Sequence, residues 1–260
     1  MDLTNLPAPA FTAIDGVTQG VAAVCYMAIG IAAWLRAPAD VRTRVFLAFS
    51  IANLVVFGIP TLWWLRGTTD PTKLPVAATA TIIAALGVGA LLLFHFTQVF
   101  PRRRPWIKGS GPQMAAGYCL VPVVLAGLVR FVPSSVDSLT VPYVLAFIVF
   151  GFPLLVLLGF VLPVAAIVSL LRSHKDVQQG GLGHLKAPLE VILLSQIAGG
   201  TLGVVFAPVL TRLAPFLTGL ALNSTIQSAL TIAIWAFGLL TPLGYAAAVW
   251  KFSVLSLDPG

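Results

Sequence analysis

Seven long apolar runs make up most of this chain and leave it few ways to fold. They cover residues 17–36, 43–66, 75–100, 112–132, 140–172, 187–211 and 225–252. A helix of about 20 apolar residues crosses the hydrocarbon core of a bilayer, and it satisfies its own backbone hydrogen bonds there. The short alternating segments of a membrane β-barrel are absent. The sequence therefore predicts an all-α polytopic membrane protein, a bundle of seven transmembrane helices.

Composition supports this class. Charged side chains make up 9% of the 260 residues and hydrophobic ones 58%, whereas a soluble domain carries about 25% charged residues. We expect an external N-terminal segment (1–16) without the basic region of a signal peptide, a transmembrane domain (17–252) and a cytoplasmic tail (253–260).

The basic residues predict the orientation of the bundle. One set of connections and chain ends carries eleven of them: Arg36, Arg42, Arg44, Arg102, Arg103, Arg104, Lys108, Arg172, Lys175, Lys186 and Lys251. The opposite set carries four: Arg66, Lys73, Arg130 and Arg212. Lys and Arg concentrate on the cytoplasmic side of membrane proteins, so we expect an external N-terminus and a cytoplasmic C-terminus.

Net charge suggests what the cytoplasmic side contacts. The four acidic residues on each side leave the whole net charge of +7 on the cytoplasmic side. The basic residues lie in short patches between the apolar runs, as residues that set membrane topology do. This distribution does not indicate a nucleic-acid-binding surface. The densest patch, the expected cytoplasmic basic face, contains Arg102, Arg103, Arg104 and Lys108. It faces anionic lipid head groups or an acidic protein partner.

Three polar residues stand out near the cytoplasmic ends of the spans. His95 lies six residues before Pro101, with Gln98 after it, and Glu190 lies shortly after the start of the sixth run. Ionisable groups inside a span are candidates for function, and His95 and Glu190 fall at a similar expected depth. Three roles stay open for His95: signalling or proton handling, a structural hydrogen bond, or ligation of a pigment or metal.

Cofactor and catalytic sites are not expected. All five lysines, at positions 73, 108, 175, 186 and 251, lie in connections or at span ends. A retinal Schiff base needs a buried lysine, and a bis-histidine haem needs a second histidine within the spans. His174 and His184 instead fall in the expected cytoplasmic loop 173–186. No catalytic motif is recognisable, so we expect a protein without enzymatic activity.

Proline and small residues mark the fifth and sixth runs. Pro142, Pro153 and Pro163 lie along the fifth run, where each favours a kink that is either static or a hinge. The sixth run has a small residue at every fourth position: Ser195, Gly199, Gly203 and Ala207. Such a face lets a neighbouring helix approach closely, either within the bundle or across a homodimer.

The outer side offers a possible ligand rim. Its members are Asn53, Trp63, Trp64, Arg66, Arg130 and Arg212. These side chains suit an anionic or amphiphilic ligand, but Trp and Arg also serve as ordinary anchors at the membrane interface.

Two short segments prompt a family resemblance. FHFTQVFPRRRPW (94–106) ends the third run, and LLTPLGYAAAVWKFSVLSLD (239–258) ends the seventh. They resemble the seven-transmembrane-helix sensor module that precedes histidine kinase, serine phosphatase or cyclase domains in bacterial receptors. The matching positions are His95, Phe96, Phe100, Pro101 and Arg102, and Pro242, Tyr245, Ala246, Lys251, Leu257 and Asp258.

The resemblance implies a receptor function. We expect a sensor that relays a ligand or membrane signal to a cytoplasmic partner, or to an output domain that would follow near residue 258. The segment Trp250–Ser253 departs from the aromatic-basic pattern of that family. The alternative is a non-catalytic accessory subunit of a larger membrane complex.

Overall fold

The computed structural model describes residues 13–67, 74–100, 111–130, 149, 153–154, 157–179, 183–199, 232, 236 and 239–248. Every regular element within them is helical, which confirms the all-α prediction for this part of the chain. The labelled elements are α1 (Ala13–Arg36), α2 (Val41–Leu65), α3 (Val76–Val99), α4 (Gly111–Arg130), the π-helical turn η6 (Leu157–Val161), α7 (Leu162–Gln179), the 3-10 turn η7 (Gly183–Leu185) and α8 (Lys186–Gln196). We call the helical segment Leu239–Ala248 the C-terminal helix.

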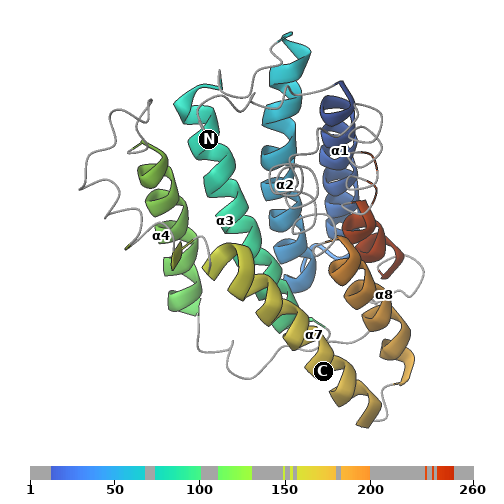
Figure 1. The fold of residues 1–260 in the computed structure, drawn as a ribbon. Coiled ribbons are helices and arrows are strands. Elements are labelled where there is room, and N and C mark those ends of the chain that lie inside the picture. Colours follow the sequence, from blue (N-terminus) through green and yellow to red (C-terminus); the bar gives the residue numbers. More distant parts are fainter. Residues whose placement is uncertain are drawn as a thin grey trace, which may run out of the picture.

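The first four helices lie side by side, each antiparallel to the one before it (Figure 1). Helix α7 packs against α3, and α8 packs against α7. Among the described residues, three helices are long and apolar enough to cross a membrane: Gly16–Arg36, Val41–Leu65 and Val76–Val99. We call the end of the bundle where α1 finishes and α2 begins the basic end.

Local sequence signals define where the first helices stop and start. Asp40 caps the N-terminus of α2, where its side chain accepts a hydrogen bond from the backbone nitrogen of Arg42 at 2.8 Å. Gly67, with φ of 80°, follows the C-terminal cap of α2 in the left-handed conformation that glycine adopts readily. Helix α3 ends at Val99 because Phe100, which precedes a proline, is extended.

Helix α7 differs from the prediction. It continues to Gln179, so His174 is helical and does not lie in a loop over 173–186. The apolar run stops near residue 172, but an amphipathic helix can continue past that point, since Ser173 and Val177 stay buried while Lys175 and Asp176 are exposed. The next described element, the turn η7, begins at Gly183.

A wider helical turn precedes Pro163 in the same segment. The backbone nitrogen of proline carries no hydrogen to donate, and the proline ring crowds the carbonyl group four residues earlier. The π-helical turn η6 (Leu157–Val161) ends two residues before Pro163, which is where such a distortion is expected. Pro142 of the predicted kinked helix lies outside the described residues.

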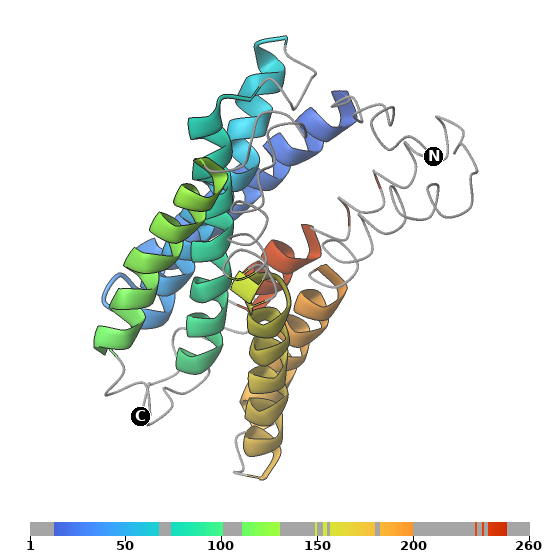
Figure 2. The same ribbon diagram turned by 60° about the vertical axis from the view of Figure 1, so that its left-hand side comes forward.

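Aromatic rings hold the core together near the basic end. The buried cluster includes Tyr26 of α1, Phe46 and Phe49 of α2, Phe96 of α3 and Tyr245 of the C-terminal helix. The C-terminal helix therefore lies between α8 and the layer formed by α1 to α3 (Figure 2). Residues 1–12 and the tail 253–260 lie outside the described residues.

Candidate functional site at the end of helix α3

Residues 95–98 of α3 form a junction where several helices meet. His95 contacts α4, because its Nδ1 lies 2.7 Å from the hydroxyl oxygen of Tyr118. The two rings are stacked, with centroids 6.1 Å apart. His95 therefore links α3 to α4 through a hydrogen bond whose direction depends on the imidazole tautomer.

Phe96, the next residue, points to a different pair of elements. Its ring centroid lies 5.1 Å from that of Tyr245 in an edge-to-face arrangement and 5.9 Å from that of Phe46. Phe46 in turn stacks on Tyr245 at 4.9 Å. These three rings join α2, α3 and the C-terminal helix, and aromatic pairs of this geometry attract one another beyond simple burial.

The polar residues that follow join α3 to α7. Gln98 donates from Nε2 to the Ser169 hydroxyl at 3.0 Å, and that hydroxyl donates to the carbonyl oxygen of Thr97 at 3.3 Å. All three side chains are buried. Successive side chains of a helix point in directions about 100° apart, so four consecutive residues of α3 contact α2, α4, α7 and the C-terminal helix.

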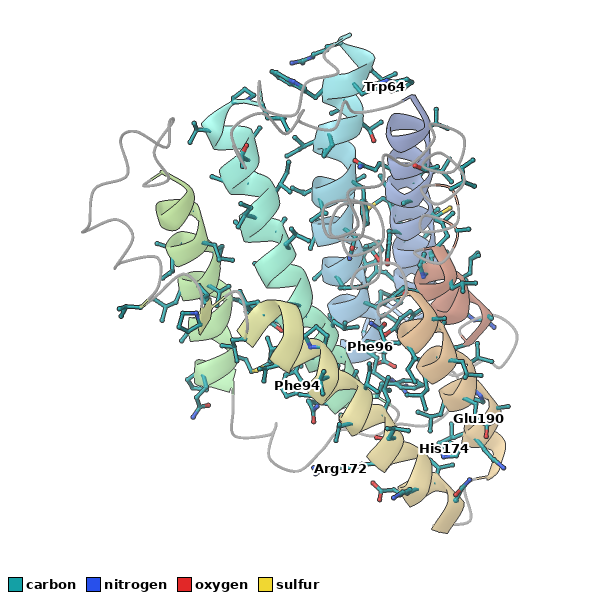
Figure 3. The ribbon with its side chains drawn as sticks, viewed as in Figure 1. Trp64, Phe94, Phe96, Arg172, His174 and Glu190 are labelled. Carbon is teal, nitrogen blue, oxygen red and sulfur yellow. The ribbon has the colours of Figure 1, made fainter. Side chains whose placement is uncertain are left out.

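Glu190 does not join this junction. Its Oε1 lies 3.0 Å from Nε2 of His174 and 3.9 Å from Nζ of Lys186. Figure 3 shows His174 and Glu190 together near the far ends of α7 and α8, away from Phe96. His95 and Glu190, which the sequence places at a similar depth, therefore form these hydrogen bonds with different partners, Tyr118 and His174.

Depth along the helices explains the difference. Ser169 is level with Thr97, and His174 lies five residues farther along α7, about 7.5 Å beyond that level at 1.5 Å per residue. Glu190 is level with His174. His95 lies on the other side of Thr97, and α7 packs between α3 and α8.

Ser195 packs within the bundle. A Cβ atom at Gly244 would collide with the side chain of Ser195 and lie 3.3 Å from the carbonyl oxygen of Val191. The Thr241 hydroxyl also donates to the carbonyl oxygen of Ser195 at 3.3 Å. Gly199 is buried just beyond α8. The other small residues of the stripe, Gly203 and Ala207, lie outside the described residues.

The members of the expected outer rim whose side chains are described lie along α2 or at its C-terminal cap. Trp64 lies directly over Gly16 of α1, where an added Cβ would collide with the indole ring. Asn53 lies twelve residues before the end of α2, about 18 Å along the axis, and its amide donates to the carbonyl oxygen of Phe49 at 2.8 Å. Of the remaining members, Trp63 is half-buried, Arg66 is exposed at the cap of α2, Arg130 ends α4 with its side chain not described, and Arg212 is not described.

The basic end contains an ion pair that the sequence interpretation missed. Arg42 is 4% exposed, and its Nη2 lies 2.6 Å from Oδ2 of Asp40. Its Nε also donates to the same carboxylate at 2.9 Å. The sequence analysis interpreted Arg42 only as a topology signal. Asp40, two residues earlier, is the sequence feature that indicates the ion pair. The expected basic face Arg102, Arg103, Arg104 and Lys108 lies outside the described residues.

The contacts described for residues 95–98 are hydrogen bonds and ring packing. In the described part of the chain, no group of three or more His, Cys, Asp or Glu side chains is placed to hold a metal ion. Comparison of the chain with protein-family models, with curated proteins and with solved structures finds no match.

Proposed function

We propose that the chain is the sensor module of a bacterial inner-membrane receptor, and that residues 95–98 couple its helices. The proposal includes seven membrane-spanning helices, an external N-terminus and a cytoplasmic C-terminus. The observation that carries it is the junction at the end of α3, where His95, Phe96 and Gln98 contact different helices. The same residues lie in one of the two segments that resemble the receptor family.

The contact between Phe96 and Tyr245 gives the coupling a direction. It joins the two segments that carry the resemblance, although they are far apart in the sequence. Tyr245 belongs to the last described helix, and the chain beyond it leads to the cytoplasmic tail. A signal that changes the packing around α3 would therefore shift the C-terminal helix, provided that it interacts differently with two states of the bundle.

A fusion protein tests this proposal. A histidine-kinase output domain is fused after Asp258, and its autophosphorylation is measured in membranes at matched expression. We expect Phe96→Ala and Gln98→Leu to change the kinase activity several-fold in either direction. The control Val123→Ala, at an exposed position of α4, leaves it unchanged.

The same experiment can contradict the proposal. Kinase activity that is equal in the wild type, both junction variants and the control would mean that the junction does not control the C-terminal helix. Purification in mild detergent adds a second readout. A stoichiometric membrane protein that copurifies with the chain would support the accessory-subunit hypothesis instead.

A further inference from the structure

The π-helical turn η6, which leads into α7, has a hydrogen-bonding pattern that can change. It covers Leu157–Val161, and Pro163 follows within the first turn of α7. Hydrogen bonds in a π-helix span five residues, so a π-helical turn accommodates about one residue more than an α-helical turn. Because proline donates no backbone hydrogen bond, a change of pattern at this point breaks fewer bonds than it would elsewhere in the helix.

Leu158, inside this turn, packs beside Gly87 of α3. A Cβ atom at Gly87 would lie 3.3 Å from Cδ1 of Leu158 and would collide with Leu125 of α4. Leu158 is buried, whereas Leu157 and Val161 of the same turn are exposed. The glycine therefore lets side chains from α4 and η6 meet against the backbone of α3.

The extra residue determines which way Leu158 points. Ala166 and Leu170 are fully buried and define the buried face of α7. Leu158 comes eight residues before Ala166, so in a continuous α-helix it would point about 80° away from Ala166 at 100° per residue. One extra residue in the wide turn removes about 100° of rotation and brings Leu158 to within about 20° of the buried face.

The same geometry defines a second register. In a continuous α-helix Gly159, seven residues before Ala166, would point to within about 20° of the buried face. Glycine has no side chain to fill the space beside Gly87. The contacts of Leu158 therefore favour the π turn, whereas regular backbone geometry favours the α-helix, since π-helices are rare.

We propose that η6 is a register switch. The segment exchanges between the observed π turn, with Leu158 beside Gly87, and a continuous α-helix, with Gly159 in that position. The exchange turns residue 157 by about 100° around the helix axis. A signal that interacts differently with the two registers would change how this segment packs against α3 and α4. Use of the switch for signalling rests on the proposed receptor function, but the exchange itself does not.

Deletion of Gly159 tests whether the turn holds an extra residue. The deletion places Leu158 seven residues before Ala166, so a continuous α-helix would keep Leu158 on the buried face. We expect the melting temperature of the purified protein to stay unchanged or to rise by up to about 3 °C.

Deletion of Leu171 is the matched control, because Leu171 is an exposed residue of α7 and lies outside η6. It rotates Val177 away from the buried face, and we expect the melting temperature to fall by at least about 5 °C. An equal fall after both deletions would mean that η6 holds no extra residue, which overturns the proposal.

Double electron–electron resonance tests the exchange itself. Nitroxide labels are attached to Val24→Cys of α1 and Leu157→Cys, both at exposed positions, in a protein whose Cys25 and Cys119 are replaced by alanine. We expect two label-to-label distances in this protein in lipid nanodiscs, and one distance when Gly159 is also deleted. One distance in both proteins would show that η6 is static. Two distances in both would show that they do not arise from η6. Either result rejects the switch.

The kinase fusion separates the switch from the receptor function. Deletion of Gly159 should change the kinase activity several-fold, because only one register remains. If Phe96→Ala changes the activity and the deletion does not, the junction controls the output and η6 has no part in signalling. If neither changes it, the receptor proposal fails, whereas the label distances still decide whether the two registers exist.

Discussion

The ring of Phe96 lies 5.1 Å from the ring of Tyr245, at an interplanar angle of 71°. One residue belongs to α3 and the other to the C-terminal helix, and both are buried. This edge-to-face contact makes the end of α3 a structural support for the last described helix. It also gives the first prediction.

Phe96→Ala should destabilise the bundle by about 2–4 kcal/mol, because it removes a buried ring and leaves a cavity between three helices. The free energy of unfolding can be measured by titration with sodium dodecyl sulfate in mixed micelles, followed by circular dichroism. Val123→Ala serves as the control, because Val123 is 70% exposed and we expect a change below about 0.5 kcal/mol. Equal effects of both variants would contradict the packing role of Phe96.

Gly244→Ala should weaken the contact between the C-terminal helix and α8. The added methyl group collides with Ser195, and overpacking of this kind costs about 1–3 kcal/mol. Ser195→Gly in the same chain should restore part of the stability, because it removes the colliding atoms.

A matched glycine provides the control for this pair. Gly127 of α4 has open space around the position of an added Cβ. Gly127→Ala should be neutral or stabilise the helix by up to about 1 kcal/mol. Failure of Ser195→Gly to improve the Gly244→Ala protein would show that the two residues are not in contact.

Asp40→Asn should destabilise the basic end by about 2–4 kcal/mol, because it removes the carboxylate that pairs with the buried guanidinium of Arg42. Asparagine still caps the helix, so the change isolates the ion pair from the cap. Thermal unfolding of the purified protein gives the measurement. Asp176→Asn, at an exposed position of α7, should leave the melting temperature within about 1 °C of the wild type.

Cysteine accessibility tests the proposed orientation. In a chain with Cys25 and Cys119 replaced by alanine, Arg66→Cys should react with a membrane-impermeant maleimide in intact spheroplasts, and Lys175→Cys should not. Both positions are exposed, so both should react after permeabilisation. Reaction of both cysteines before permeabilisation would contradict the proposed placement of these two positions on opposite sides of the membrane.

Helix positions were predictable from the sequence where apolar composition and local signals agree. The predicted run 43–66 corresponds to α2 at Val41–Leu65, and the predicted run 75–100 corresponds to α3 at Val76–Val99. The end of α3 before Pro101 also follows from a local steric rule. The end of α7 could not be predicted in this way, because hydropathy marks where apolar side chains stop and not where the helix stops.

Side-chain partners needed the folded chain. His95 and Glu190 look alike in the sequence, as polar groups near the ends of apolar runs, yet their hydrogen bonds go to Tyr118 and His174. The choice depends on which helices are neighbours and on how far each extends along its partner. The hydropathy of a single segment does not show which helices become its neighbours or how far it extends along them.

Taken alone, the sequence determined the helical class of the described residues and, to within about two residues, the bounds of α2 and α3, because backbone hydrogen bonding and hydropathy act over one turn or one run at a time. It placed the start of α1 at residue 17, four residues after Ala13, where the helix begins. The tertiary structure alone decided that Phe96 meets Tyr245, that Arg42 is buried with Asp40, and that Ser195 lies against Gly244. The packing of helices decides which residues become neighbours, as for Phe96 with Tyr245 and Ser195 with Gly244. The burial of Arg42 depends on which parts of the chain pack over its charged side chain.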